Sequence, residues 1–88
     1  GIDSGKMTLI VTDKGHEVAG KIDEYIGRGA TILKGKGSYT GADKEVVMCA
    51  CNNKQMYSIR KMVKEVDPRC FIVIMESSEV VGEGFKEA

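Results

Sequence analysis

The sequence predicts an α+β sandwich whose elements follow the order β-α-β-β-α-β. Three observations predict it: four short runs rich in β-branched and apolar residues, two longer segments with apolar residues at helical spacing, and glycine, asparagine or proline between them. Right-handed β-α-β crossovers around a central β-β connection give a ferredoxin-like fold, with two helices on one face of a four-stranded antiparallel sheet. In such a fold the first and third strands lie at the centre of the sheet.

The first strand and the first helix are predicted on either side of Asp13. Met7–Thr12 is a β-rich run, and Asp13 is expected to be the N-cap of a helix that begins near Lys14. Gly27 or Gly29 is expected to end that helix, because glycine tolerates the left-handed conformation of a C-cap. The apolar stripe of this helix consists of Val18, Ile22, Tyr25 and Ile26.

The remaining strands are predicted from short apolar runs. The second begins at Ala30 and ends at Lys34 or Lys36, the third covers Glu45–Cys51, and the fourth covers Cys70–Glu76. The third and fourth runs are apolar on both faces, without the alternation of a sheet that faces water on one side. Another copy of the domain is the simplest cover for such a face, so we expect a homo-oligomer assembled through the sheet.

The second helix has sequence signals at both ends. Asn52 and Asn53 are candidate N-caps, and Gln55 follows Asn52 at the spacing of a capping box. Asp67 precedes Pro68, which disfavours the helical conformation of the residue before it. The apolar stripe consists of Met56, Ile59, Met62, Val63 and Val66, and the basic outer face of Lys54, Arg60, Lys61 and Lys64. Such a face is ordinarily solvated, although beneath a membrane it could contact anionic lipid.

Length and charge limit the classes of function. Eighty-eight residues make one domain, which we expect to span residues 6–88 after a linker at residues 1–5. The net charge is zero and the pI is about 6.8, which argues against a nucleic-acid binder that acts through a general basic field. Residues 28–44 are locally basic and residues 76–88 locally acidic. These two segments are either neighbours in the fold or separate solvated surfaces.

The residues with catalytic or metal-binding chemistry form no familiar set. The chain has three cysteines and one histidine, His16, and an odd cysteine count favours a reduced, buried role. Zinc would need all four of these side chains, and no nucleophile stands in a fixed relation to a base. We therefore expect no metal, no cofactor and no enzymatic activity, and a solvated His16.

The glycine-rich segment from Gly27 to Gly41 is the strongest candidate for a binding site. Its second part combines backbone amides, hydroxyl groups and basic side chains, which suit a phosphate-bearing or other anionic, nucleotide-like ligand. The predicted ligand-binding residues are Arg28, Gly35, Lys36, Gly37, Ser38, Tyr39, Thr40 and Gly41. The segment is not a Walker-type loop, since a strand follows it. The alternative is a mobile hairpin loop whose glycines serve only the turn.

Several segments carry a family resemblance. R-G-A-T-I-L-K-G-K-G-S-Y-T-G at residues 28–41, V-V-M-C-A-C at 46–51, D-P-R-C-F-I-V-I at 67–74 and E-V-V-G-E-G-F at 79–85 resemble the C-terminal domain of unknown function in YitT-type bacterial membrane proteins. The opening G-I-D-S-G resembles the segment that joins this domain to the preceding membrane helices. Where such domains usually have alanine after the Asp-Pro pair, this chain has Cys70.

The resemblance implies a cytoplasmic domain on the inner membrane, next to the membrane helices of its own parent chain. It implies no settled activity. The fold is similar in outline to PII signal proteins, which are trimers whose loop between the second and third strands helps to bind nucleotides at subunit clefts. We therefore expect a regulatory or ligand-sensing domain. The alternative is an oligomerisation or docking module of a membrane transporter that binds no small molecule.

Overall fold

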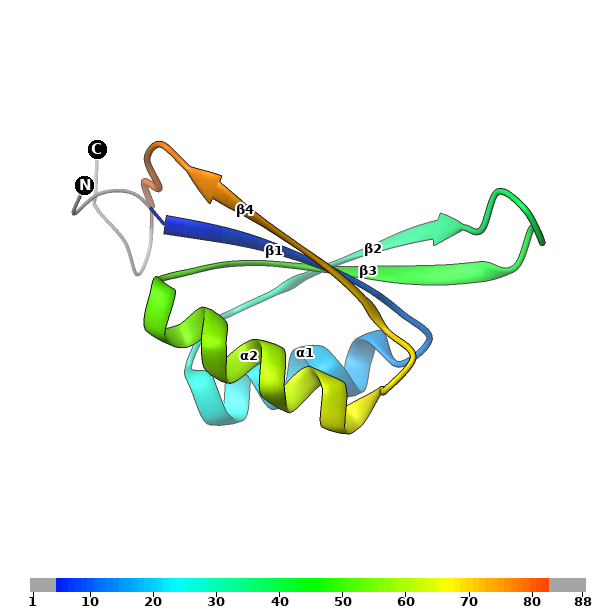
Figure 1. Ribbon diagram of the computed structural model, residues 1–88, viewed down its shortest axis with the longest axis horizontal. Helices are drawn as coiled ribbons and strands as arrows, with labels where there is room; N and C mark the ends of the chain where they lie inside the picture. The colour runs from blue at the N-terminus through cyan, green and yellow to red at the C-terminus, as the bar shows by residue number, and fades with distance from the viewer. Residues whose placement is uncertain (1–4, 83–88) are drawn as a thin grey trace.

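The computed structural model describes residues 5–82, and their elements follow the predicted order β-α-β-β-α-β. The four strands form one antiparallel sheet of order β2-β3-β1-β4, and both helices cover the same face of it (Figure 1). The strands are β1 (Gly5–Thr12), β2 (Thr31–Lys36), β3 (Asp43–Cys51) and β4 (Phe71–Ser77); the helices are α1 (Gly15–Ile26) and α2 (Asn53–Val66). This is the predicted ferredoxin-like sandwich, with the first and third strands at its centre.

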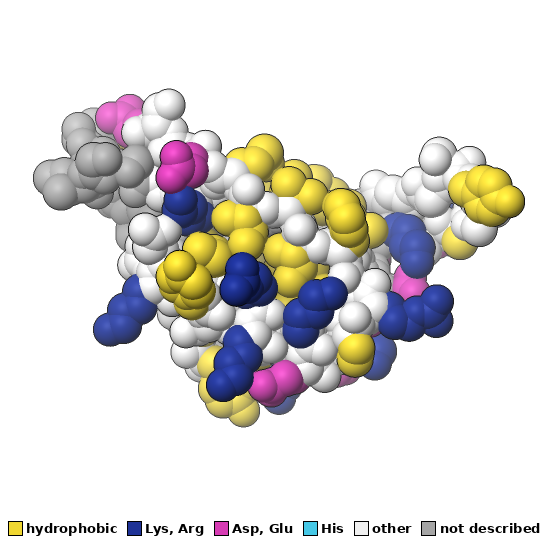
Figure 2. Space-filling model, viewed as in Figure 1, with side chains coloured by type: hydrophobic (Ala, Val, Ile, Leu, Met, Phe, Trp, Pro, Cys, Tyr) yellow, Lys and Arg dark blue, Asp and Glu magenta, His cyan; other side chains and the backbone are white. Residues whose placement is uncertain are grey.

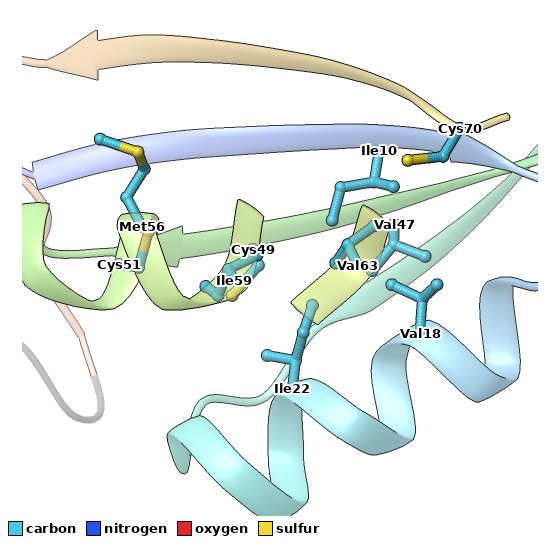
Figure 3. Packing of buried hydrophobic residues seen from close by; sticks show 10 residues of the cluster. All are labelled: Ile10, Val18, Ile22, Val47, Cys49, Cys51, Met56, Ile59, Val63 and Cys70. Carbon is cyan, nitrogen blue, oxygen red and sulfur yellow. The ribbon is translucent and has the colours of Figure 1, made fainter. Parts of the chain in front are cut away.

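The hydrophobic core lies between the helices and the covered face of the sheet. Ile10 of β1 and Val47 of β3 are fully buried against Val18 and Ile22 of α1 and Ile59 of α2 (Figure 3). Burying one such side chain contributes about 1.5–3 kcal/mol, so this single layer supplies most of the apolar stabilisation. Both predicted helical stripes contribute to it, through Val18, Ile22, Met56, Ile59 and Val63.

Three of the four helix ends agree with the prediction. Asn52 accepts from the backbone N–H of Gln55 at 2.8 Å, and Gln55 Oε1 accepts from the N–H of Asn52 at 3.0 Å, which is a complete capping box. Gly27 ends α1 in the left-handed conformation, with φ of 76°. Asp67 follows the last residue of α2 in an extended conformation, as expected before Pro68.

The start of α1 differs from the prediction. The N-cap is Lys14 and has no side-chain cap, because the Asp13 carboxylate binds Lys44 Nζ at 3.2 Å instead. Glu45 of β3 supplies the missing acceptor, since its Oε1 accepts from the backbone N–H of Gly15 at 2.9 Å. An acidic group is favourable at a helix N-terminus, whichever strand provides it.

Several strand boundaries also differ. β1 begins at Gly5, which the prediction placed in the linker, and β3 begins at Asp43, before the predicted start at Glu45. β2 ends at Lys36, which is one of its two predicted ends. Gly35 and Lys36 are therefore paired strand residues, opposite Lys44 and Asp43. Residues 1–4 of the predicted linker and residues 83–88 of the predicted domain lie outside the described residues.

The second face of the sheet has no helix of residues 5–82 packed against it (Figure 1). Its side chains are those that alternate with the core residues, and three of them are strongly exposed: Phe71 at 65%, Leu33 at 45% and Met75 at 43%. We call this surface the open face. Its apolar members are Met7, Leu9, Val11, Leu33, Val46, Met48, Ala50, Phe71, Val73 and Met75. The prediction of strands that are apolar on both faces is thus confirmed.

Candidate functional site

The glycine-rich segment forms the end of the β2–β3 hairpin, which projects beyond the helices (Figure 1). Residues 37–42 make the turn. The N–H of Gly37 donates to the carbonyl of Ala42, and the N–H of Gly41 donates to the carbonyl of Gly37, both at 2.8 Å. The N–H of Ala42 donates to Thr40 Oγ1 at 3.1 Å. These three amides therefore stabilise the turn and do not form part of an open anion nest.

The geometry of the turn accounts for most of the loop residues that the sequence analysis predicted to bind a ligand. Gly41 has φ of 73°, which favours glycine, and a Cβ at Gly37 would lie 3.3 Å from Thr40 Oγ1. Lys36 Nζ binds Asp43 Oδ1 at 2.8 Å. Ser38 and Tyr39 lie at the tip, where Tyr39 is 99% exposed and Figure 2 shows a hydrophobic side chain at the end of the projecting hairpin.

Neither turn geometry nor steric crowding explains why residue 35 is a glycine. It lies in β2 opposite Lys44, on the same side of the sheet as the open face. Its φ is outside the left-handed region, and a Cβ added there would meet no atom within 4 Å. A glycine inside a strand weakens it, and often marks a place where a ligand or another backbone approaches closely.

A cleft lies at the base of the hairpin, where β2 and β3 meet the end of β1. Its volume is about 460 Å³, and it is lined by Asp13, Lys34, Gly35, Asp43, Lys44 and Glu45. Lys44 is held by Asp13, whereas Lys34 makes no ion pair with another residue in the 5–82 range. The cleft therefore contains one lysine without an ion pair, Lys34, next to the backbone of Gly35.

The structure does not bring Arg28 to the hairpin. Arg28 is half-buried and its Nε donates to Gln55 Oε1 at 3.2 Å, next to the start of α2. Its positive charge also acts on Cys49 and Cys51, where it opposes the rise in their pKa values. The whole of β2 separates this position from the turn, so among the predicted site residues Arg28 stands apart from Gly35–Gly41.

Glu45 is a cleft residue that sequence reasoning missed. It is polar at the start of an otherwise apolar strand, which was the only signal available from the sequence. Its Oε2 lies 3.9 Å from Nε2 of His16, whose side chain is 88% exposed. His16 is therefore on the surface, as predicted, beside a carboxylate that already accepts a bond from the first turn of α1.

The cysteines are buried and their thiols are poor nucleophiles. Burial raises the pKa of Cys49 to about 11, with a smaller contribution from Cys51, and burial also raises the pKa values of Cys51 and Cys70. All three cysteines are free. Within the described part of the chain, no three His, Cys, Asp or Glu side chains cluster closely enough to hold a metal ion.

Together the fold and these surfaces define a small ferredoxin-like domain with an open apolar sheet face and a cleft at the base of a projecting hairpin. The chain belongs to the family described as "Uncharacterized protein conserved in bacteria (DUF2179)", which matches residues 28–82. It is 34% identical over 88 residues to the UPF0750 membrane protein YvjA and 35% identical over 78 residues to the UPF0750 membrane protein YitT, both from Bacillus subtilis. These alignments cover 100% and 88% of this chain but only 31% and 28% of the relatives.

Solved structures agree with this assignment. A DUF2179 protein from Eubacterium ventriosum has 30% sequence identity and a TM-score of 0.68, over 81% of this chain and 97% of that chain. A putative PII-like signaling protein from Thermus thermophilus has a TM-score of 0.70 over 83% of this chain and 85% of that one; at 14% identity it shows a shared fold alone. The resemblance to YitT-type proteins and the PII-like outline are thus confirmed. None of the helices in residues 5–82 is long and apolar enough to cross a membrane.

Proposed function

We propose that this chain is a non-enzymatic regulatory domain of a bacterial membrane protein, and that its copies associate through the open face. The relatives described as membrane proteins support the attachment, since the chain matches about a third of their length. Three free cysteines suit the reducing cytoplasmic side of the inner membrane. The observation that carries the proposal is the uncovered apolar face of the sheet.

The open face is continuous across all four strands. Leu9 of β1 lies between Met48 of β3 and Val73 of β4, and the neighbouring rows are equally apolar. Strand spacings of about 4.8 Å and a rise of about 3.3 Å per residue give a face of roughly 400 Å². Exposed apolar patches of this size are often interaction surfaces.

Charge favours a second copy as the occupant. The three central rows of the open face contain no charged residue, so two such faces can meet without bringing like charges together. Closed symmetric oligomers are built from such self-complementary surfaces. The membrane helices of the parent chain are the other candidate cover, and they would leave the isolated domain monomeric.

Analytical ultracentrifugation of the chain tests the proposal. We expect concentration-dependent self-association, and we expect Leu9→Lys to weaken it by at least tenfold because the charge would be buried in the contact. Tyr25→Lys is the matched control, since Tyr25 is 62% exposed on α1 and away from the open face. A wild-type chain that stays monomeric at high micromolar concentration would overturn the proposal.

The non-enzymatic part of the proposal is supported by the chemistry of the candidate catalytic groups. The one histidine is exposed and its nearest carboxylate caps a helix, while the thiols are buried and protonated at neutral pH. A nucleophile is activated by an adjacent base or by a lowered pKa, whereas burial raises the pKa values of these thiols. Neither His16 nor a thiol is thus arranged to start covalent catalysis.

A second candidate function, ligand sensing, is favoured by the cleft at the base of the hairpin. Lys34 could bind a phosphate or carboxylate group there, in the space beside Gly35. The site proposed from the structure is therefore the base of the hairpin and not its tip, where the turn amides bond one another. The PII-like neighbour contributes only the shared fold to this argument.

Thermal denaturation with nucleotides and cyclic dinucleotides tests the second candidate. A ligand at a hundred times its Kd stabilises a protein by about 2.7 kcal/mol, which for a domain of this size raises Tm by roughly 15 °C. We expect Lys34→Gln to abolish that rise. Lys36→Gln is the matched control, since Lys36 is paired with Asp43 and does not line the cleft. If no anionic metabolite raises Tm, the ligand-sensing candidate fails.

A further inference from the structure

The outer surface of α2 carries a concentration of positive charge that neither the core nor the hairpin uses. Each of its basic side chains lies three, four or seven residues from Tyr57 in the sequence. At these spacings the side chains project from one side of the helix. They are Lys54, Arg60, Lys61 and Lys64, and Glu65 is the one acidic residue of the helix. Figure 2 shows these basic side chains gathered over α2. We call this the basic surface.

The basic surface is not neutralised within the described part of the chain. The ion pairs among residues 5–82 lie elsewhere, between Lys6 and Glu76 and at the base and stem of the hairpin. Lys64 Nζ donates to the backbone carbonyl of Cys70 at 2.8 Å, which is a neutral acceptor. Tyr57 is 63% exposed at the centre of the surface, with the Arg60 guanidinium 5.8 Å from its ring.

The surface also includes a shallow hollow. It is wide and open, has a volume of about 600 Å³ and is lined by Tyr57, Arg60, Lys61, Lys64 and Glu65. Tyrosine side chains combine an apolar ring with a polar tip and are enriched where membrane meets water. Lysine and arginine can lay their apolar stems along such a surface and keep their charged groups at the headgroups.

The charge is local and not a property of the whole chain. The net charge of the protein is zero, and the neighbouring helix α1 has the opposite balance, with Glu17, Asp23 and Glu24 against Lys21. The helical layer is therefore basic along α2 and acidic along α1. A negatively charged plane would be attracted to the α2 side and repelled by the α1 side, which fixes an orientation.

We propose that the basic surface binds the anionic headgroups of a phospholipid bilayer. The inference rests on the proposed function in one respect, that the domain belongs to a membrane protein and lies close to a bilayer. Basic residues next to an anionic leaflet are attracted by its surface potential. Because α2 lies on the opposite side of the sheet from the open face, one copy can contact lipid and a second copy at the same time (Figure 1).

Vesicle co-sedimentation of the 88-residue chain tests the inference. The chain is 30% identical to a solved DUF2179 chain and spans 97% of it, so a domain of this extent folds without membrane segments. We expect binding to vesicles that contain phosphatidylglycerol and not to pure phosphatidylcholine vesicles. Each basic residue near such a surface strengthens binding about fivefold, so Arg60→Gln with Lys61→Gln should weaken it roughly twenty-five-fold.

The matched control neutralises two lysines outside α2, with Lys21→Gln and Lys36→Gln, and should change binding less than threefold. Equal losses in the two double variants, no binding to anionic vesicles, or equal binding to neutral vesicles would each overturn the inference. Inorganic phosphate and potassium chloride are also compared at the same ionic strength. If phosphate displaces the chain from vesicles more strongly than potassium chloride does, the surface binds a soluble phosphate and the lipid inference is overturned. Self-association of the Arg60→Gln, Lys61→Gln variant should be unchanged, which separates this inference from the proposed assembly.

Discussion

Glu45 of β3 accepts a hydrogen bond from the backbone N–H of Gly15 at 2.9 Å, so a strand residue caps the first turn of α1. The contact is close enough to require glycine: a Cβ at position 15 would lie 2.6 Å from Glu45 Oε1. Glu45 also lines the cleft at the base of the hairpin. This contact therefore fixes the position of the helix relative to the candidate ligand cleft.

Gly15→Ala should destabilise the fold although alanine is the better helix former. The new Cβ would displace the Glu45 carboxylate, and losing a cap costs about 1–2 kcal/mol. Gly20→Ala is the matched control in the same helix, since nothing lies within 4 Å of its added Cβ and its φ is ordinary. That variant should gain about 0.5–1 kcal/mol. Urea denaturation measures both, and equal effects of the two variants would refute the role of the contact.

Thr12→Val should cost stability in a pH-dependent way. Thr12 Oγ1 donates to Asp67 Oδ2 at 2.6 Å in a buried position, and this bond holds the pKa of Asp67 below its usual value. Because the folded pKa is the lower one, the bond stabilises the fold fully above the unfolded pKa of about 3.9. Its contribution then disappears as the pH falls through the folded pKa. We expect a cost of about 1.5 kcal/mol near neutral pH that shrinks in acid.

Thr8→Val provides the control for that pH dependence. Thr8 is buried on the same strand and its Oγ1 donates to the carbonyl of Cys49 at 3.0 Å, an acceptor that does not titrate. Its cost, about 1 kcal/mol, should be the same at neutral and acid pH. Denaturant titrations at both values compare the variants. A Thr12→Val cost that does not change with pH would show that the charge of Asp67 contributes nothing to the bond.

Local rules predicted the fold because each of its elements carries its own signal. The order of strands and helices, the capping box at Asn52 and Gln55, and the C-caps at Gly27 and Asp67 depend on neighbours in the sequence. The open face was predicted because alternate residues of a strand point to opposite faces, and in the third and fourth strands both sets are apolar. Agreement among these local preferences is what gives a short chain a single topology.

The candidate site was harder to predict because it depends on contacts between distant segments. Asp13 is a good N-cap by residue type, but Lys44 lies within reach of it and Glu45 takes its place. Arg28 is close to the glycine loop in sequence, yet a full strand separates them in space. Sequence proximity therefore placed Arg28 in the site, whereas the basic residues that line the cleft are Lys34 and Lys44.

Asn52→Ala should destabilise the domain by about 1 kcal/mol, whereas Asn53→Ala should have little effect. Both residues were candidate N-caps, but only Asn52 accepts from the N–H of Gln55, while Asn53 is already the first residue of α2. Thermal or urea denaturation resolves a difference of this size. Equal costs for the two variants would mean that the capping box contributes nothing to stability.

Gly35→Ala should separate the stability of the fold from its function. Position 35 tolerates a Cβ without contact, and glycine in a strand costs backbone entropy, so we expect a gain of about 0.5 kcal/mol in the free energy of unfolding. If Gly35 is there to admit a second backbone or a ligand, the same variant should weaken self-association, or the ligand-induced rise in Tm, by about tenfold in affinity.

Gly29→Ala is the matched control for that experiment. Gly29 also has room for a Cβ and an ordinary φ, but it lies before β2 and away from both the open face and the cleft. It should leave self-association and ligand response unchanged. Sedimentation, and thermal denaturation with ligand, distinguish the two roles of Gly35. If Gly35→Ala loses only self-association, Gly35 belongs to the subunit contact. If it loses only the ligand-induced rise in Tm, Gly35 belongs to the cleft. If Gly35→Ala changes neither, then Gly35 serves neither role, and Lys34 becomes the residue on which the ligand-sensing candidate depends.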